Sequence, residues 1–383
     1  MTTNNDLWSK VNSNAQLLED VAQSDTKDVA SMASLRKQWS VEEIVIAVSL
    51  LDARKRADGK LDNANSILAD STGVQQATST RIAQHKAKRF LTQEPVFDLC
   101  CGIGSDLLAL PEQTIGIDSD HLRCWMASQN SGKETRVEDV LQLDIPNNAL
   151  IHIDPSRRSG TNRLHALDAM LPAIDEITTI ATSCAGGCIK VSPAVDVDEL
   201  EDFPLPFELE YIEEHGRVVQ GVIWFGSLAH HVGQVTATSM TIEQTMSDEP
   251  CQPPFDSTIH GWILEPNPAL ERSGLHGNLA RDLGASEPAS GIGLCTAPTN
   301  PDSPWFQSFE VLGTTSLRLE KVSALLATLG CSQVEVKTRD KVVDPNQWQN
   351  ILSHDPHGPL LTVFALRLGK MRISVITRRH KHL

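Results

Sequence analysis

The residues best suited to chemistry follow one apolar run, residues 95–99, which leads into a Cys-Cys-Gly-Ile-Gly turn at 100–104. Asp98 lies near the end of that run, and residues 106–110 after the turn have a helical pattern. Glycines let a ligand approach the main chain closely, and the start of a helix presents unpaired N–H groups. A strand, a glycine turn and a helix in this order therefore predict a binding site for a nucleotide-like cofactor.

Two common glycine motifs are excluded. The dinucleotide fingerprint needs a third glycine at position 107, where this chain has Leu107. A P-loop needs Gly-Lys-Ser/Thr, which the sequence lacks. Cys184 and Cys188 are spaced like metal ligands, but no second pair with zinc spacing follows them. We expect these cysteines to be small buried residues before a strand, and we predict no metal site.

Three more acidic residues follow predicted strands. Asp118 ends the next apolar run, 14 residues after Gly104, where a carboxylate can accept hydrogen bonds from both hydroxyls of a ribose. Asp139 follows a third run and can accept from an adenine amino group, and Asp154 ends a fourth. Ligands of open α/β sheets bind beyond the carboxyl ends of the strands. The ordered set of acids therefore carries more weight than the glycine turn alone.

The loop at the fourth strand reads Asp-Pro-Ser-Arg-Arg and carries groups that can bind and orient a substrate. Asp154, followed by Pro155, can orient an acceptor or take its proton. Arg157 and Arg158 can clamp a phosphate or carboxylate, or they can form surface salt bridges with this acidic protein. Lys190 ends a later predicted strand near the same rim, or it is simply exposed to solvent there.

The elements that must position these residues fall into three parts. Residues 1–92 predict a helical N-terminal cover. Residues 93–246 alternate short β runs with helices, which is typical of a Rossmann-like α/β domain with a doubly wound parallel sheet. An antiparallel hairpin at 207–225 closes one edge of that sheet. Residues 258–383 predict a small α+β domain.

Within these parts, the turn and cap signals are local. Ser40 predicts a helix start, with Glu43 as its capping-box partner. Residues 247–257 predict a polar linker, and residues 285–304 predict a second flexible segment. The predicted strands are 96–100, 114–118, 149–154, 187–192, 207–213 and 218–225, then 305–312, 333–337, 360–368 and 372–377, and the predicted C-terminal helices are 268–283 and 317–329.

Composition indicates a globular cytoplasmic protein of 383 residues, with 40% hydrophobic and 21% charged residues. It has no apolar run long enough for a membrane span and no signal-peptide pattern at its start, so we expect no membrane association. The net charge is −16, yet residues 261–383 hold 13 Lys and Arg against 11 Asp and Glu. The acidic residues before 261 argue against an extended nucleic-acid-binding surface there, but the C-terminal part can make a smaller contact with nucleic acid.

The ordered set of motifs resembles the class I S-adenosylmethionine-dependent methyltransferases. The Asp-Leu-Cys-Cys-Gly-Ile-Gly form at 98–104, after Arg-Ile-Ala-Gln-His at 81–85, is similar to the branch that includes the trimethylguanosine synthases. Over roughly residues 35–380, the chain is similar to bacterial methyltransferases with a C-terminal THUMP-like domain, which have Asp-Pro-(Ala/Ser)-Arg-Arg after strand four. The C-terminal segments that match are 264–269, 308–312 and 334–339.

This resemblance implies S-adenosylmethionine as the cofactor. It puts the methionine end at Asp98, Cys100, Gly102 and Gly104, the ribose at Asp118 and the adenine at Asp139. The chain departs from the family at Ser105, where glycine is more common, and we expect little effect because serine can cap a helix. It also lacks the Asn/Asp-Pro-Pro-aromatic loop that holds the base amine in amino-methyltransferases. The resemblance therefore does not imply base-amine methylation by that arrangement.

The expected function is S-adenosylmethionine-dependent methyl transfer to RNA. The resemblance implies that the THUMP-like part presents RNA, with phosphate contacts from a basic tail. The residues of that tail, which can equally form a solubilising terminus, are Lys370, Arg372, Arg378, Arg379, His380 and Lys381. Two alternatives stay open: a non-catalytic RNA- or nucleotide-binding module on the same fold, and a methyltransferase of a small anionic molecule.

Overall fold

The computed structural model describes residues 4–91, 94–157, 167, 170–355 and 357–380. By their contacts these residues form two units. The first runs to Leu209 and includes Gln220–Val232, and the second comprises Glu210–Val219 and the chain from Gly233 onward. The division falls within a hairpin rather than in a linker, and the three-part division of the sequence stays a prediction. Among the described helices, none is long and apolar enough to cross a membrane.

Helices form the described N-terminal residues, as the sequence predicts: α1 (Asn4–Ser13), α2 (Ala15–Gln23), α3 (Val29–Leu35), α4 (Val41–Ala57) and α5 (Ser71–Gln76). Short polar residues cap their first turns by accepting main-chain N–H bonds, among them Asn14 and Asp28. The buried apolar side chains, such as Leu50, share one core with Ile103 and Met126 from the following part of the chain. This packing ties the helical cover to the segment that carries the glycine turn.

The predicted capping box of α4 is present and links this cap to stability in acid. The Glu43 carboxylate bonds the Lys10 ammonium at 2.7 Å and the Ser40 N–H at 3.0 Å, and these contacts lower the pKa of Glu43 from 4.5 to about 2. Because the pKa falls on folding, ionised Glu43 stabilises the fold above pH 4.5, and this stabilisation is lost as the pH falls toward 2.

We expect Glu43→Gln to lower the free energy of unfolding by about 1–3 kcal/mol at pH 7. The same substitution should have a much smaller effect at pH 2, near the folded-state pKa of Glu43, where most of the stabilisation by the ionised carboxylate has been lost. Urea denaturation of both proteins at the two pH values measures the difference. A loss of equal size at both would show that the carboxylate charge is not the cause.

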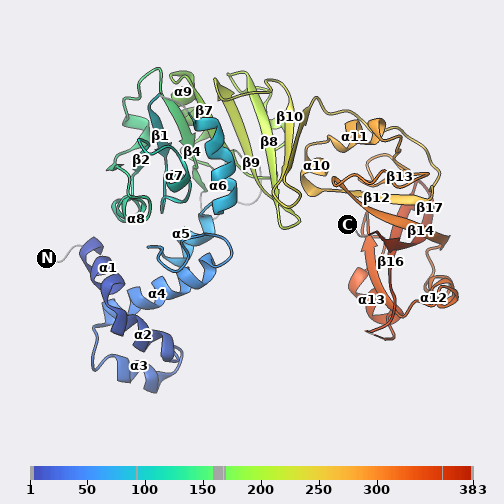
Figure 1. Cartoon of the computed structure of the whole chain (residues 1–383), viewed down its shortest axis with the longest axis horizontal. Coiled ribbons are helices and arrows are strands. Elements are labelled where there is room, and N and C mark those ends of the chain that lie inside the picture. The colour runs from blue at the N-terminus through green and yellow to red at the C-terminus, as the bar shows by residue number, and fades with distance from the viewer. Residues whose placement is uncertain (1–3, 92–93, 158–166, 168–169, 356, 381–383) are drawn as a thin grey trace. The chain divides into compact units, whose positions relative to one another are not determined.

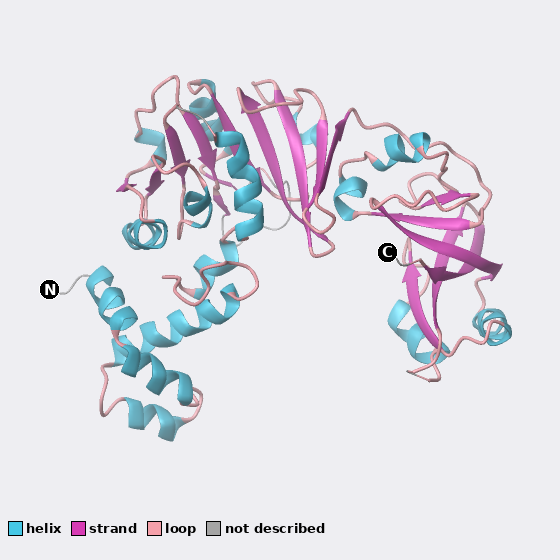
Figure 2. Cartoon of the chain, viewed as in Figure 1, coloured by secondary structure: helices cyan, strands magenta, loops and turns pink. Residues whose placement is uncertain are grey.

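The central sheet contains β1 (Val96–Leu99), β2 (Ile115–Asp118), β3 (Thr135–Val137), β4 (Leu150–Ile153), β7 (Gly186–Val191), β8 (Phe207–Glu214), β9 (Arg217–Gly226), β10 (Val235–Ser239) and β11 (Gln244–Asp248). Its strand order is β11-β10-β8-β9-β7-β4-β1-β2-β3 (Figure 1, Figure 2). The strands from β7 to β3 are parallel, and β9 runs antiparallel to β7. The predicted doubly wound sheet with an antiparallel edge is confirmed. The sequence missed β10 and β11, because their serines and threonines resemble a loop.

The strand order reverses between β1 and β4: β2 and β3 are added to the sheet on one side of β1, and β4 and β7 are added on the other. Open α/β sheets bind ligands at this switch point, outside the carboxyl ends of the strands. The connecting helices are α6 (Thr80–Ala87), α7 (Ser105–Ala109), α8 (His121–Ser131) and α9 (Ile174–Thr182). All residues of β1 and β4 are buried, as expected for strands covered on both faces.

A second sheet, in the order β13-β12-β14-β17-β16-β15, belongs to the C-terminal part and confirms the predicted α+β elements. Its strands are β12 (Trp262–Pro266), β13 (Cys295–Ala297), β14 (Phe306–Ser316), β15 (Gln333–Thr338), β16 (Leu360–Leu368) and β17 (Met371–Arg379). The helices are α10 (Pro268–Arg272), α11 (His276–Asp282), α12 (Leu319–Thr328) and α13 (Pro345–Leu352). Only β15 and β16 pair in parallel. The sequence missed β12, β13 and α13.

Three expectations for this part are corrected. The predicted helix 268–283 is divided into α10 and α11, because Gly274 between them adopts φ +74°. The segment 285–304 is not a flexible connector, since it contains β13 and its glycine N–H groups at Gly291 and Gly293 bond the buried Glu287 at 3.0 and 2.9 Å. Half of the predicted basic tail, namely Arg372, Arg378 and Arg379, belongs to strand β17.

Candidate functional site

The glycine turn, residues 100–104, exposes main chain at the carboxyl end of β1. Cys100, Gly102 and Gly104 have φ of 60°, 56° and 83°, in the left-handed region that favours glycine. A Cβ on Gly104 would lie 2.9 Å from the Ala127 Cα of α8, so only glycine fits there. A Cβ on Gly102 would meet nothing within 4 Å, which leaves its main chain open to a ligand.

Asp118, at the end of β2, is fixed beside this turn. Its Oδ2 accepts the Gly102 N–H at 2.9 Å, and its Oδ1 accepts the Asp120 N–H at 2.9 Å. Burial raises the pKa of Asp118, although both main-chain donors oppose the shift. Each oxygen keeps a further lone pair for another donor. Asp139 follows β3 and is exposed, with its Oδ1 accepting the Leu141 N–H at 3.0 Å.

Asp98 lies inside the fold and not on its surface. Its side chain is fully buried, and its Oδ1 is 2.7 Å from His152 Nδ1, while its Oδ2 has no hydrogen-bond partner within the described residues. Burial raises the pKa of Asp98, and His152 opposes this shift. Burial, together with Asp118 and other carboxylates, also raises the pKa of Cys100. Cys100 is therefore a neutral thiol at neutral pH and a poor nucleophile.

A buried network continues from Asp98 through His152, which the sequence analysis missed. The Lys86 ammonium is 2.8 Å from His152 Nε2 and 2.7 Å from Asp106 Oδ1. An ammonium can only donate, so His152 Nε2 accepts and its Nδ1 proton is donated to Asp98. Burial opposes both charges, but the attraction between them is stronger. Asp106 therefore raises the pKa of Lys86, and Lys86 lowers the pKa of Asp106. The sequence signal that could have indicated this network is His152, a histidine inside an apolar strand.

At the end of β4, the structure brings two of the predicted acceptor-side residues together. Asp154 Oδ2 is 2.6 Å from Lys190 Nζ of β7, with 26% and 18% of their side chains exposed. Lys190 is therefore an ion-pair partner and not a solvent-exposed lysine. Pro155 is buried, Arg157 has its backbone in β5 (Ser156–Arg157), and Arg158 lies outside the described residues. β5 pairs with β6 (Met170–Leu171).

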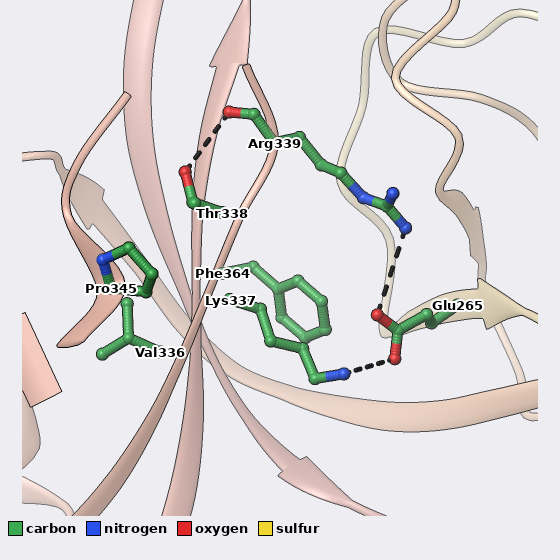
Figure 3. Close-up of a pocket in the computed structure, with 7 residues that line it drawn as sticks. All are labelled: Glu265, Val336, Lys337, Thr338, Arg339, Pro345 and Phe364. Atoms are coloured by element: carbon green, nitrogen blue, oxygen red, sulfur yellow. Dashed lines mark hydrogen bonds and ion pairs between the residues drawn. The ribbon is translucent and has the colours of Figure 1, made fainter. Parts of the chain in front are cut away.

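The C-terminal part has a hollow of about 280 Å³ along β15 (Figure 3). Its lining residues are Glu265, Val336, Lys337, Thr338, Arg339, Pro345 and Phe364. Lys337 Nζ is 2.6 Å from Glu265, and Arg339 lies 3.2 Å from Glu271. The two cations thus already have anionic partners, so this hollow offers little unbalanced positive charge to a phosphate.

No protein-family profile matches the sequence. An uncharacterized S-adenosylmethionine-dependent methyltransferase of Mycobacterium tuberculosis, found in strains CDC 1551 and H37Rv, is 27% identical over 362 residues, which cover 89% of this chain and 96% of the relative. A solved structure from Porphyromonas gingivalis W83, assigned as a methyltransferase, matches with a TM-score of 0.75 and 16% identity over 98% of both chains. The fold is that of a methyltransferase. In this methyltransferase fold, the glycine turn, Asp118 and Asp154 lie at the carboxyl ends of β1, β2 and β4.

Proposed function

We propose that this chain is an S-adenosylmethionine-dependent methyltransferase. The observation that carries the proposal is the open glycine turn at the switch point of the sheet, with Asp118 fixed beside it by the Gly102 N–H. The relative from Mycobacterium tuberculosis, which bears this name, matches nearly the whole chain and not only the sheet. Calorimetric titration of the full chain with S-adenosylmethionine and S-adenosylhomocysteine tests the proposal, and failure to bind either would overturn it.

The residues present fit this cofactor. The oxygens of Asp118 retain lone pairs for the two ribose hydroxyls. We assign the methionine end to the turn that follows Asp98, whose buried Oδ2 has no hydrogen-bond partner among the described residues. The exposed Asp139 can accept from the adenine amino group. Gly102 has left-handed backbone and is only partly buried, so its main chain stays accessible between these acids.

S-adenosylmethionine supplies an activated methyl group, so the protein mainly has to align donor and acceptor. Asp154 is held in one place by Lys190 at 2.6 Å, beside the strand that carries the glycine turn. It can orient the acceptor or take its proton. We assign acceptor binding to the loop that follows, with Pro155 as its fixed start and Arg157 and Arg158 as partners for a phosphate.

We propose RNA as the acceptor, and a basic hairpin end in the C-terminal part supports this choice. We define this end by Arg367, Lys370 and Arg372. Arg367 of β16 and Arg372 of β17 lie directly opposite each other. Gly369, whose φ is +60°, and Lys370 form the two-residue turn between the strands. All three are exposed, and no described acidic side chain bonds them. Like charges opposite each other are unfavourable, and a bound phosphate removes that repulsion.

The arginines at the other end of β17 differ. Arg378 is 3.2 Å from Glu310, and Arg379 is 2.8 Å from Glu335. The phosphate contact that the sequence analysis assigned to a basic tail is therefore better supported at the hairpin end. We keep the THUMP-like resemblance of this part as a proposal.

Replacing Arg367 and Arg372 together by glutamine is expected to weaken RNA binding and to lower the slope of log affinity against log salt by about 1–2. The matched control, Arg378→Gln with Arg379→Gln, removes the same charge from the other end of β17 and should leave the slope unchanged. Electrophoretic mobility shifts with a single-stranded RNA and an RNA hairpin at several salt concentrations measure both. Equal losses in the two double variants would overturn the assignment of phosphate to the hairpin end.

Turnover decides among the alternatives. The full chain is incubated with labelled S-adenosylmethionine and total RNA of the source cell, or with its small-molecule extract. Label in RNA supports the proposal, label in the extract alone favours a small anionic acceptor, and cofactor binding without any transfer favours a non-catalytic module. The full chain is needed because Ala237 packs in one core with Leu264, and Asn267 bonds Glu213 and Ser239. Deleting the residues after 257 would break that core.

A further inference from the structure

Thr78 lies in the connection between α5 and α6 and belongs to neither of the residue sets described above. We propose that Thr78 is a positioning residue that joins the cofactor side of the site to the acceptor carboxylate. The proposal rests on the methyltransferase function proposed above. Thr78 is 4% exposed, and its main-chain N–H and its hydroxyl both form hydrogen bonds with other segments.

The contacts of Thr78 have defined directions. Its hydroxyl donates to Asp106 Oδ2 at 2.6 Å and accepts from Lys190 Nζ at 3.2 Å. An ammonium can only donate and a carboxylate here accepts, so the single hydroxyl hydrogen must go to Asp106. The Thr78 N–H also donates to Ser105 Oγ at 3.2 Å. Ser105 and Asp106 directly follow the glycine turn, so one residue bonds the cofactor side twice and the acceptor side once.

Lys190 shows why the bond from Thr78 is needed. Its ammonium has three hydrogens, and three acceptors surround it: Asp154 Oδ2 at 2.6 Å, Thr78 Oγ1 at 3.2 Å and the Gln76 carbonyl at 3.4 Å. The last residue of α5 and the connection that follows it supply two of the three, Gln76 and Thr78. These two acceptors therefore fix the direction from which Lys190 reaches Asp154.

The serine that departs from the family pattern takes part in this arrangement. Glycine at position 105 would offer no side-chain acceptor for the Thr78 N–H, whereas Ser105 Oγ accepts it. Without the Thr78 hydroxyl, Lys190 would lose one acceptor, and the buried Asp106 would lose one donor. Asp106 would still have Lys86 at 2.7 Å. We therefore expect the acceptor carboxylate to be affected more than the cofactor turn.

The test compares Thr78→Val, which keeps the shape and removes the hydroxyl, with Thr78→Ser, which keeps the hydroxyl. We expect Thr78→Val to lower kcat for methyl transfer to total RNA about 10- to 100-fold, since small errors of alignment have effects of this size. Its affinity for S-adenosylhomocysteine should change less than about threefold. Thr78→Ser should restore most of the rate. Lys190 should react several-fold faster with acetic anhydride in Thr78→Val, as measured by peptide mass spectrometry.

Ser79→Ala is the matched control, because Ser79 caps α6 by accepting the Ile82 N–H and has no bond to Lys190. It should leave Lys190 acetylation unchanged even if it lowers the stability of the fold. Equal rates in the Val and Ser variants, or a proportional loss of cofactor affinity and rate, would overturn the positioning role. If the wild-type chain methylates no RNA, the proposed function fails, and the acetylation rates alone decide on Thr78: unchanged acetylation in Thr78→Val would overturn it.

Discussion

Replacing Lys86 by methionine is expected to lower the free energy of unfolding by about 3–5 kcal/mol, the largest stability effect that we predict for this chain. Only 1% of the Lys86 side chain is exposed, and its ammonium lies between Asp106 and His152. Methionine has a similar length, so the change leaves no large cavity. The loss arises because Asp106 would remain buried without its cationic partner.

A second variant separates this cause from simple misfolding. Lys86→Met combined with Asp106→Asn removes both charges, while the asparagine carbonyl can still accept from Thr78. We expect the double variant to regain at least half of the stability lost in Lys86→Met, because a buried ion pair adds little over neutral groups that fill the same space. Urea denaturation at pH 7 measures all three proteins. Additive losses, or a loss below about 1 kcal/mol for Lys86→Met, would show that the two charges do not depend on each other.

Most of the fold followed from local patterns. β1, β2, β4 and β7 were predicted because each is a short apolar run bounded by turn residues, and strands buried on both faces have that pattern. The capping box at Ser40 spans only four residues and was predicted for the same reason. β10 was missed because its sequence, Val-Thr-Ala-Thr-Ser, is rich in hydroxyl residues and resembles a loop. These hydroxyls form hydrogen bonds with residues distant in sequence, as Thr238 does with Glu210.

The same distinction applies to the candidate site: residues marked by local sequence could be predicted, and contacts between distant residues could not. The glycine turn and Asp118 could be predicted, because each follows a strand and the ends of parallel strands lie at one edge of a sheet. The pairing of Lys190 with Asp154 could not, since the two residues are 36 positions apart and meet only when β7 pairs with β4. Lys86 and His152 are 66 positions apart. A lysine on an amphipathic helix normally faces solvent, and nothing near Lys86 in the sequence marks it as buried.

Asp118→Ala is expected to weaken binding of S-adenosylhomocysteine by roughly 100-fold or more. A carboxylate that accepts two ribose hydroxyls makes two charge-assisted hydrogen bonds, each of about 1.5–3 kcal/mol. The substitution also removes the acceptor of the Gly102 N–H, which fixes the glycine turn. The fold should persist, because Asp118 is only partly buried at the end of β2 and its side chain joins no ion pair with another described residue.

Two further variants decide whether the loss belongs to the ribose or to the turn. Asp118→Asn keeps one oxygen that can accept from Gly102 or Asp120 but removes the charge, so its affinity should fall between those of the wild type and Asp118→Ala. Asp120 caps α8, because its Oδ1 accepts the Leu122 N–H at 2.8 Å. Asp120→Ala removes this cap and should lower the stability of the fold without a comparable loss of affinity for S-adenosylhomocysteine. Calorimetry gives each affinity, and circular dichroism during heating gives each stability. If Asp118→Ala binds S-adenosylhomocysteine as tightly as the wild type, the ribose lies elsewhere, and the order of strand ends that assigned it to β2 is wrong.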